Sequence, residues 1–332
     1  MDLLKKTGWL LALVLLITGL VACEEETEEE YSADTMTGTV VCDVPYFVMK
    51  GETVTLTASG IEYPTDVTYR WHIGGVYVDT LAANTVTVRF PDSLGLFTVS
   101  ATAYSPGFYV STNSRQVTTI DTAWNTSLQG LSRGTGYITD ERDGRSYGYV
   151  TLGGLDWFNQ NLAWHGAGVP YKASVAAAPL FGSLYTWEEA MSTDVCPEGW
   201  RVPDNADWES LAAALGGREL PFVDSWAGLG EKASADAYMN DERMWPYCPD
   251  NAHTNVGGWN ALPLGYSFRA EKAAVVSGLN EYGCWWSATP KDAGTAFYRY
   301  IWYDRADFPM NYTGKNDLRI HVRCVRTHPQ SS

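Results

Sequence analysis

Between residues 38 and 120 the chain alternates apolar and polar side chains in short runs, separated by glycine and proline clusters. Successive side chains of a strand point to opposite faces, so a period of two predicts strands with one buried face. Five or more such strands at this spacing predict an all-β sandwich, with Trp71 as the buried aromatic residue of its core. The runs are residues 39–42, 53–57, 67–71, 85–90 and 97–102.

From residue 137 onward the pattern mixes strands with helices. Turn signals at Asp143-Gly144 and Gly153-Gly154 predict β-hairpins. The predicted strands are residues 147–152, 155–158, 259–268, 284–289, 295–304 and 318–326.

The last of these, residues 318–326, is predicted to be half buried. The period-two pattern places Cys324 on the buried face of this strand. Arg319, His321 and Arg323 are expected on the opposite, exposed face.

Two helices are predicted in the same part of the chain, the first over residues 183–191. The second begins at Asp204, a residue type that caps helix N-termini, with Asp207 three residues further on. It ends at Gly216-Gly217. Its apolar face consists of Trp208, Leu211, Ala212 and Leu215.

Residues 121–136 are polar and rich in glycine, which predicts a linker between the two regions. Gly130, Ser132 and Gly134 match the Gly-x-Ser-x-Gly motif of hydrolases by letter. That motif works between a buried strand and a helix. Polar residues precede it here and Thr-Gly-Tyr follows, so we interpret the match as accidental.

The N-terminus carries an export signal: Lys5 and Lys6, an apolar run at 9–17, and a Leu-Val-Ala-Cys sequence that ends at Cys23. The run is too short for a stable membrane span. The ending resembles the bacterial lipobox, which implies removal of residues 1–22 and lipid attachment to Cys23. An uncleaved anchor and a plain secretory signal are the alternatives.

Six glutamates occupy seven positions at residues 24–30. A block of like charge repels itself, so residues 23–37 are predicted to form an extended acidic tether. The arrangement also resembles the surface-export signal of Bacteroidetes-type lipoproteins. A simple spacer is the alternative.

Composition narrows the function classes. The chain has 332 residues and a formal net charge of −16. An acidic chain lacks the basic face that phosphate contacts need, so we expect no nucleic-acid partner. The length is enough for two domains with sizeable cores, and 14 Trp, 20 Tyr and 10 Phe indicate folded, β-rich structure.

Eight short motifs follow one another between residues 137 and 327. They are Asp143-Gly144, Trp157-Phe-Asn-Gln-Asn161-Leu162, Leu184-Tyr-Thr-Trp187, Cys196-Pro-Glu-Gly-Trp200-Arg-Val-Pro203, Trp208, Asn260-Ala-Leu-Pro-Leu-Gly265, Trp285-Trp-Ser-Ala-Thr289 and Val322-Arg-Cys324-Val325. Their order resembles the Fibrobacter succinogenes major paralogous domain. The resemblance implies an α+β variant of the C-type lectin fold over residues 137–327. The sandwich at 38–120 is similar to PKD or Ig-like modules of cell-surface proteins.

The same resemblance implies a disulfide between Cys196 and Cys324. Of the other cysteines, Cys248 and Cys284 are the candidates for a second bridge across the long loop. Cys284 departs from the family pattern, which usually has another residue type there. Cys42 is then left as a small buried apolar residue of the sandwich.

Motifs for catalysis and for cofactor binding are not found. The sequence has no His-Glu-x-x-His, no Cys-x-x-Cys and no phosphate-binding glycine loop. The Glu-Pro-Asn or Gln-Pro-Asp and Trp-Asn-Asp motifs of calcium-dependent lectins are missing too. We therefore predict no catalytic residue, no metal and no cofactor, and expect that the protein is not an enzyme.

Ligands of lectin-like folds meet the long loop and a late strand, which correspond here to residues 240–255 and 298–312. In the predicted strand, Tyr298, Tyr300, Trp302 and Asp304 share one side by period two. Aromatic rings stack on sugars, and polar groups beside them fix orientation. The predicted ligand-binding residues are Trp245, Tyr247, Trp302, Asp304 and Arg305.

These features favour a lipid-anchored protein of the outer membrane, exposed at the surface of a Gram-negative bacterium, that binds a glycan or a surface protein without calcium. The lipid anchor is its expected membrane contact. A structural or assembly subunit of the envelope or of a surface appendage is the second hypothesis. Exposed aromatic residues clustered on the sandwich would favour that second hypothesis.

Overall fold

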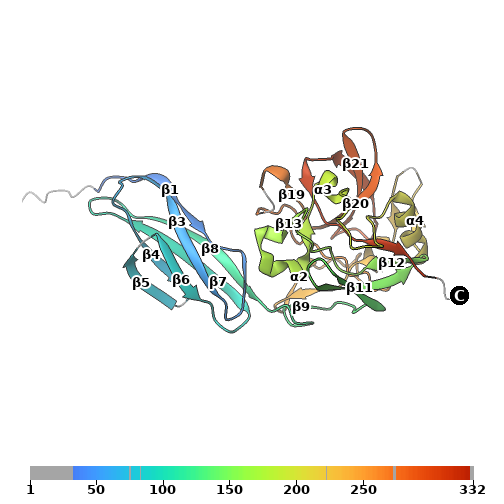
Figure 1. Ribbon diagram of the computed structural model, residues 1–332, viewed down its shortest axis with the longest axis horizontal. Coiled ribbons are helices and arrows are strands. Elements are labelled where there is room, and N and C mark those ends of the chain that lie inside the picture. The colour runs from blue at the N-terminus through green and yellow to red at the C-terminus, as the bar shows by residue number, and fades with distance from the viewer. Residues whose placement is uncertain (1–32, 75, 83, 222, 272–273, 330–332) are drawn as a thin grey trace, which may run out of the picture.

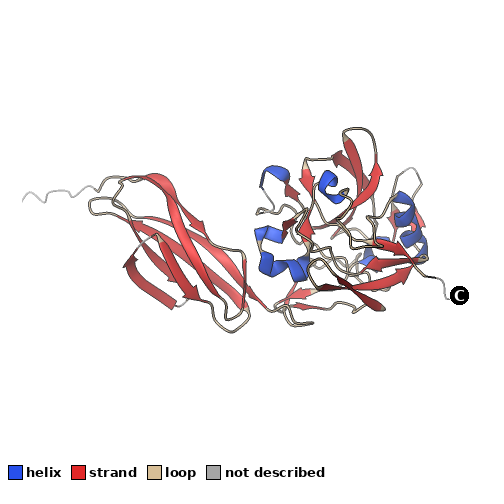
Figure 2. Cartoon of the chain, viewed as in Figure 1, coloured by secondary structure: helices blue, strands red, loops and turns tan. Residues whose placement is uncertain are grey.

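The computed structural model describes residues 33–74, 76–82, 84–221, 223–271 and 274–329. The signal sequence, Cys23 and the glutamate run lie outside the described residues. Figure 1 shows two lobes along the long axis of the molecule. We call the part built from strands β1–β8 the first lobe and the part that follows the second lobe. The helices lie in the second lobe (Figure 2), and the fold is β-rich, as predicted.

The first lobe consists of two sheets that share one core. One sheet has the strand order β1-β3-β6 and the other β2-β8-β7-β4-β5. Neighbouring strands are antiparallel, apart from the parallel pair β2 and β8. The strands are β1 (Thr37–Asp43), β2 (Phe47–Met49), β3 (Thr53–Tyr63), β4 (Thr68–Ile73), β5 (Val76–Ala82), β6 (Thr85–Arg89), β7 (Gly95–Tyr104) and β8 (Ser111–Ile120).

The alternating runs of the sequence correspond to strands β1, β3, β4, β6 and β7, and their apolar phase faces the shared core. Leu56, Val99 and Val117 are fully buried, and Trp71 is 1% exposed, as predicted. Strand β8 was not predicted because most of its residues are polar and its two faces differ little in the sequence. Its hydrogen bonds with β7 hold it in the sheet.

The packed part of the first lobe begins before β1. Asp34 exchanges backbone hydrogen bonds with Gly107 and Tyr109, at 2.9 and 2.8 Å, and Met36 is buried. The last residues of the predicted tether at 23–37 therefore pack against the loop between β7 and β8.

The second lobe contains several small sheets. The larger ones have the orders β10-β11-β12-β24 and β20-β21-β22. The predicted hairpins are present in the first of them. Its strands are β9 (Leu128–Gln129), β10 (Gly136–Asp140), β11 (Arg145–Leu152), β12 (Leu155–Phe158), β13 (Val169–Pro170), β14 (Ser183–Leu184), β15 (Arg218–Glu219), β16 (Trp226–Ala227), β17 (Tyr238–Met239), β18 (Glu242–Arg243), β19 (Ser267–Phe268), β20 (Tyr282–Pro290), β21 (Thr295–Trp302), β22 (Met310–Gly314), β23 (Leu318–Arg319) and β24 (Val325–Thr327).

Helix α4 confirms the second predicted helix, because it begins after Asp204 and ends before the glycine pair. The carboxylate of Asp204 accepts from the Asp207 backbone at 3.0 Å, and that of Asp207 accepts from the Asp204 backbone at 2.8 Å. The first predicted helix shrinks to α3, because its first residues pair as strand β14. The helices are η1 (Tyr171–Ala173), η2 (Val175–Ala177), α2 (Ala178–Phe181), α3 (Trp187–Ala190), α4 (Asn205–Ala214), α5 (Leu229–Ala233) and η3 (Arg269–Glu271).

Tryptophan rings form much of the core of the second lobe. Trp157, Trp208, Trp259 and Trp285 are all fully buried. The ring centroids of Trp157 and Trp208 lie 5.0 Å apart, and those of Trp259 and Trp285 lie 4.9 Å apart. Each of these side chains buries a large area, so this cluster is a main source of hydrophobic stabilisation in the lobe.

The disulfide between Cys196 and Cys324 is present, with the two Cα atoms 6.0 Å apart and 128 positions apart in sequence. It joins the segment after α3 to the end of the chain next to β24. The bridge therefore closes residues 196–324 into one covalent loop.

The prediction of a half-buried last strand is wrong. Residues 318–326 form two short strands joined by an irregular segment, and Arg319, His321 and Arg323 are buried along with Cys324. Their outward face is covered by segments that the period-two pattern does not reveal, including the one around Trp259.

Arg323 is fully buried, and carbonyl oxygens surround its guanidinium. Nε donates to Asn161 Oδ1 at 3.0 Å, Nη2 donates to the Asn260 carbonyl at 2.8 Å, and Nη1 donates to the carbonyls of Phe158 and Trp259. The guanidinium carbon lies 4.2 Å from the centre of the Trp259 ring. Burial lowers the pKa of Arg323 to about 9, so the side chain is still cationic at neutral pH. It fixes the irregular segment at residues 259–260 where no regular strand does so.

Apolar contacts and hydrogen bonds join the two lobes. Phe47 and Ile120 of the first lobe belong to one buried cluster with Tyr171 and Phe181 of the second. The ring centroids of Phe47 and Phe181 lie 5.5 Å apart. Ser174 Oγ donates to the Phe47 carbonyl at 3.2 Å.

The segment predicted to be a linker, residues 121–136, is packed as well. Strand β9 lies within it and pairs with β17. Asn260 Nδ2 donates to the Ser132 carbonyl at 2.8 Å. The two lobes are therefore joined by ordered chain and a shared core.

Candidate ligand-binding cavity

A cavity of about 460 Å³ lies on one face of the β20-β21-β22 sheet. The antiparallel register sets Tyr282 opposite Trp302 and Cys284 opposite Tyr300. Residues directly opposite each other point to the same face of a sheet, so these four side chains gather on the cavity side. Tyr298 joins them two residues before Tyr300.

The opposite wall comes from strands far away in the sequence. Tyr266 and Phe268 enter from β19 and the residue before it, and Leu318 and Ile320 from β23 and the residue after it. Polar groups at the cavity are those of Asn311, Thr313 and Asp317. We call this space the aromatic cavity, because six of the residues that line it are Tyr266, Phe268, Tyr282, Tyr298, Tyr300 and Trp302.

The rings of the aromatic cavity are ordered by their contacts with each other. Tyr282 and Trp302 stack with centroids 5.3 Å apart and an interplanar angle of 15°. Tyr266 meets Phe268 edge to face at 5.8 Å. None of the six rings is fully buried. The cavity therefore offers flat apolar surfaces that remain accessible.

Burial sets the protonation of the groups at the cavity. It raises the pKa of the Cys284 thiol to about 12 and also raises the pKa of Tyr298 and of Tyr300. The thiol is therefore protonated at neutral pH and is a poor nucleophile. The phenols keep their hydrogens, so they can donate as well as accept hydrogen bonds.

The strand prediction for residues 295–304 is correct except at its end. Tyr298, Tyr300 and Trp302 line the aromatic cavity together. Strand β21 ends at Trp302, and Asp304 and Arg305 lie in an exposed turn beyond it. The Arg305 backbone donates to the Trp302 carbonyl at 3.2 Å, which turns the chain away from the sheet.

Asp304 therefore does not share the face of the three aromatic residues. Arg305 stays close to the site in another way, since its guanidinium carbon lies 4.9 Å from the centre of the Trp302 ring. Its nearest carboxylate contact is a 3.9 Å approach to Asp304.

The prediction of Trp245 as an exposed wall is wrong. Its side chain is fully buried, stacks on His253 with ring centroids 4.8 Å apart, and donates from Nε1 to the Ala261 carbonyl at 3.4 Å. The loop around residue 245 folds back onto the tryptophan core. Tyr247 is 77% exposed but does not line the aromatic cavity.

The predicted bridge between Cys248 and Cys284 is also wrong, because both thiols are free. Cys284 sits in the middle of β20 and lines the aromatic cavity, which Cys248 does not reach.

Tyr266, Phe268 and Tyr282 lie outside the two predicted ligand-binding ranges, and Asn311 lies within the range 298–312 but was not named as a binding residue. Tyr282 could have been predicted from the sequence. It lies two residues before Cys284, so period two puts both side chains on the same face of the strand. Phe268 and Asn311 lie on other elements, and only the folded pairing brings them to the cavity.

Among the described residues, no three His, Cys, Asp or Glu side chains are placed so as to hold a metal ion. Within the same residues, no helix is long and apolar enough to cross a membrane.

The chain thus combines a strand-rich first lobe with a disulfide-closed second lobe that carries an aromatic cavity. A family model described as the Fibrobacter succinogenes major domain matches residues 150–326, more than half of the chain. The protein belongs to this family. The match covers the aromatic cavity and both disulfide cysteines. No curated protein matches the chain.

Proposed function

We propose that this protein is a binding protein that takes a glycan into the aromatic cavity without calcium, and that a lipid on Cys23 anchors it to the outer membrane at the cell surface. In this proposal the first lobe is a PKD or Ig-like spacer and the second lobe a C-type lectin-like head. In the same proposal the head lies beyond the spacer when counted from the anchor.

The observation that carries the proposal is the lining of the aromatic cavity. The C–H faces of a sugar ring are apolar and stack on flat aromatic side chains such as those of Trp302 and Tyr282. Asn311, Thr313 and Asp317 supply hydrogen-bonding groups at the same cavity. Few polar groups on a mostly apolar, half-enclosed wall are typical of small-ligand sites.

A calcium ion takes six to eight oxygen ligands, several of them carboxylates. Among the described residues that line the aromatic cavity, Asp317 is the one with a carboxylate. Recognition by stacking and direct hydrogen bonds therefore fits this lining better than calcium bridging does.

The decisive experiment is a glycan array probed with the full chain, followed by affinity measurement on the hits. Truncating a central aromatic residue of a binding site costs about 2 kcal/mol or more, or roughly thirtyfold in affinity. Tyr300→Ala and Trp302→Ala should each show this loss with thermal unfolding little changed. Tyr247→Ala is the matched control, because Tyr247 is exposed outside the cavity and should bind as the wild type does.

Equal binding by the wild type and both cavity variants would overturn the assignment of the site. An array without any hit, repeated with calcium added and with calcium chelated, would count against a glycan ligand.

Anchoring is tested separately. Cys23→Ser should release the protein from membranes into the soluble fraction, and unchanged fractionation with unchanged mass would refute lipidation. Protease digestion of intact cells then distinguishes surface display from a periplasmic orientation, since full protection would contradict display.

One observation favours an assembly role as the second candidate. Several apolar side chains are exposed at the end of the first lobe that lies away from the second lobe, where the ring centroids of Tyr63 and Phe108 lie 5.6 Å apart. Exposed apolar patches on a folded surface often bind proteins. The exposed side chains are Tyr63 at 58%, Tyr104 at 45%, Tyr109 at 61% and Val110 at 59%.

A photo-crosslinking residue at position 109 or at position 268 separates the two candidates. Protein adducts from position 109 on intact cells, with none from position 268, would favour assembly. Glycan adducts from position 268 would favour the binding role.

A further inference from the structure

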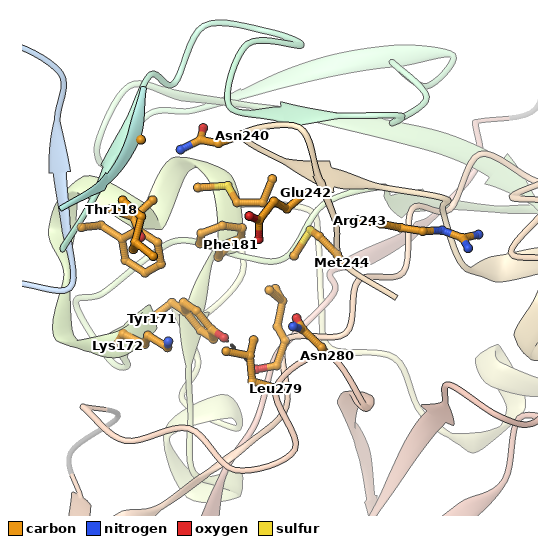
Figure 3. Close-up of a pocket in the computed structure, with 15 residues that line it drawn as sticks. Thr118, Tyr171, Lys172, Phe181, Asn240, Glu242, Arg243, Met244, Leu279 and Asn280 are labelled. Atoms are coloured by element: carbon orange, nitrogen blue, oxygen red, sulfur yellow. Dashed lines mark hydrogen bonds between the residues drawn. The ribbon is translucent and has the colours of Figure 1, made fainter. Parts of the chain in front are cut away.

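A second cavity, of about 310 Å³, lies where the two lobes meet (Figure 3). Phe47, Leu96 and Thr118 line it from the first lobe. The second lobe contributes Tyr171, Lys172, Phe181, Met244 and Leu279, among others. We call this space the junction cavity. Its volume is at the lower end of the range of ~300–1,000 Å³ found for small-molecule sites.

The apolar part of the junction cavity's wall is firmly held, and Thr118, Lys172, Asn240, Glu242, Arg243 and Asn280 supply its polar groups. Tyr171 is fully buried, its ring centroid lies 5.3 Å from that of Phe181, and its hydroxyl donates to the Leu264 carbonyl at 3.0 Å. Two apolar side chains of the lining reach the surface, because Leu96 is 65% exposed and Leu279 is 37% exposed. These exposed leucines would lose their contact with water if a ligand filled the cavity.

Lys172 is the one lysine among the described residues that line the junction cavity, and Figure 3 shows its ammonium group turned toward the space. Across the described part of the chain, no carboxylate pairs with it. Its Nζ instead lies 5.2 Å from the ring centre of Tyr46 and 5.9 Å from that of Phe47. Burial lowers the pKa of Lys172. A half-buried ammonium without a counter-charge is costly, and an incoming anion removes that penalty.

The other charged groups at the junction cavity do not fill this role. Arg243 points away from the space in Figure 3 and donates from Nε to Asp236 Oδ1 at 2.6 Å. Glu242 approaches from the β18 side, and its side chain is exposed to water. An anion is therefore attracted to the end at Lys172 and repelled at the end at Glu242, which sets the direction of the ligand.

The backbone at Lys172 is unusual as well. Lys172 and Ala173 both have positive φ, at 49° and 54°. Two consecutive residues other than glycine in this region store strain, which persists only where the surroundings hold it. With this backbone geometry the Lys172 side chain lies beside Tyr46 and Phe47 of the first lobe.

We propose that the junction cavity is a second binding site, for a small apolar molecule that carries one anionic group, with Lys172 as its counter-charge. The apolar body lies between Tyr171, Phe181 and Leu279, and the anionic group lies next to the ammonium. This site is separate from the aromatic cavity and does not depend on what binds there.

The test compares naphthoate with its neutral amide, naphthamide, by calorimetric titration of the full chain. Both probes have the same rings, and only naphthoate carries the anion. Wild type should bind naphthoate at least about tenfold more tightly, a difference of ~1.4 kcal/mol. Lys172→Met, and Lys172→Gln as a second variant, should abolish that preference while naphthamide binding stays unchanged.

Two controls locate the site. Lys232 lies outside the cavity and donates to the Gly216 carbonyl at 3.1 Å, so Lys232→Met should keep the preference. Tyr300→Ala alters the aromatic cavity alone and should keep it too. The proposal is overturned if wild type binds neither probe or both equally, if the Lys172 variants keep the preference, or if Tyr300→Ala removes it.

Discussion

The two lobes reach stability in different ways. The first lobe relies on long paired strands, such as β7 and β8, and on a core in which mostly small and aliphatic side chains pack around Trp71. The second lobe has short strands, and a few side chains hold it: the disulfide, the tryptophan cluster and the buried Arg323. We therefore expect single substitutions to be mild in the first lobe and severe in the second.

The largest expected effect is the loss of the disulfide. Replacing Cys196 and Cys324 by serine frees a loop of 128 positions, which lowers the free energy of unfolding by about 4 to 5 kcal/mol on chain-entropy grounds. Tryptophan fluorescence in denaturant reports the second lobe, because Trp71 is the one tryptophan in residues 38–120. Cys42→Ala, in the core of the first lobe, should lower stability by only about 1 kcal/mol. If the disulfide variant and Cys42→Ala lose similar amounts of unfolding free energy, the proposed contrast between the lobes is wrong.

Arg323→Met tests the second of these supports. The substitution leaves the carbonyls of Trp259 and Asn260 buried without a donor, which lowers the free energy of unfolding by about 3 to 5 kcal/mol. Arg115→Met is the matched variant in the first lobe, where Nη1 donates to the Val44 carbonyl at 2.7 Å. It should lower stability by about 1 kcal/mol. If Arg323→Met lowers the free energy of unfolding as little as Arg115→Met does, the segment at 259–260 does not depend on Arg323 for its stability.

Acid should weaken the second lobe through two buried histidines. Burial lowers the pKa of His253 from 6.5 to about 4 and that of His321 to about 3. The unfolded chain then binds more protons than the folded one as the pH falls below 6.5. The stabilisation is complete above that value and is lost progressively toward pH 4, on the order of 3 kcal/mol for each residue.

Chemical denaturation followed at several pH values between 7 and 4 measures this loss. His253→Gln should flatten the slope, because the glutamine does not titrate. An unchanged slope in that variant would mean that other groups control the acid response.

The smallest effect is expected on the surface of the first lobe. Thr55 and Thr87 face each other across β3 and β6 with their hydroxyl oxygens 3.0 Å apart. Thr55→Ala should lower the free energy of unfolding by about 0.5 kcal/mol, the usual size for an exposed cross-strand pair. A loss above about 2 kcal/mol by urea denaturation would contradict distributed stability in this lobe.

The same contrast explains which features the sequence could predict. Period two identified β3 and β7 because each has one face in water and one in the core. The capping residues Asp204 and Asp207 identified α4, since that signal is local. Arg323 was predicted to face outward, but it lies in the irregular segment between β23 and β24, which is buried on both sides, so period two does not indicate its orientation.

The aromatic cavity was predictable in part. Tyr298, Tyr300 and Trp302 share one strand, so their common face follows from spacing alone. Tyr266 and Asn311 come from other elements, and long-range pairing brings them there. Trp245 was misplaced because composition does not tell whether a loop aromatic residue faces water or folds back onto a core.

The contacts of Phe47 and Ile120 with Tyr171 and Phe181 have a mechanical consequence. Because the two lobes share a core, they move together as one rigid body. A molecule held at its N-terminal end therefore aims the aromatic cavity in a direction set by the orientation of the first lobe. A ligand that pulls on that cavity transmits torque along the whole length of the molecule, back to the point where the chain is held.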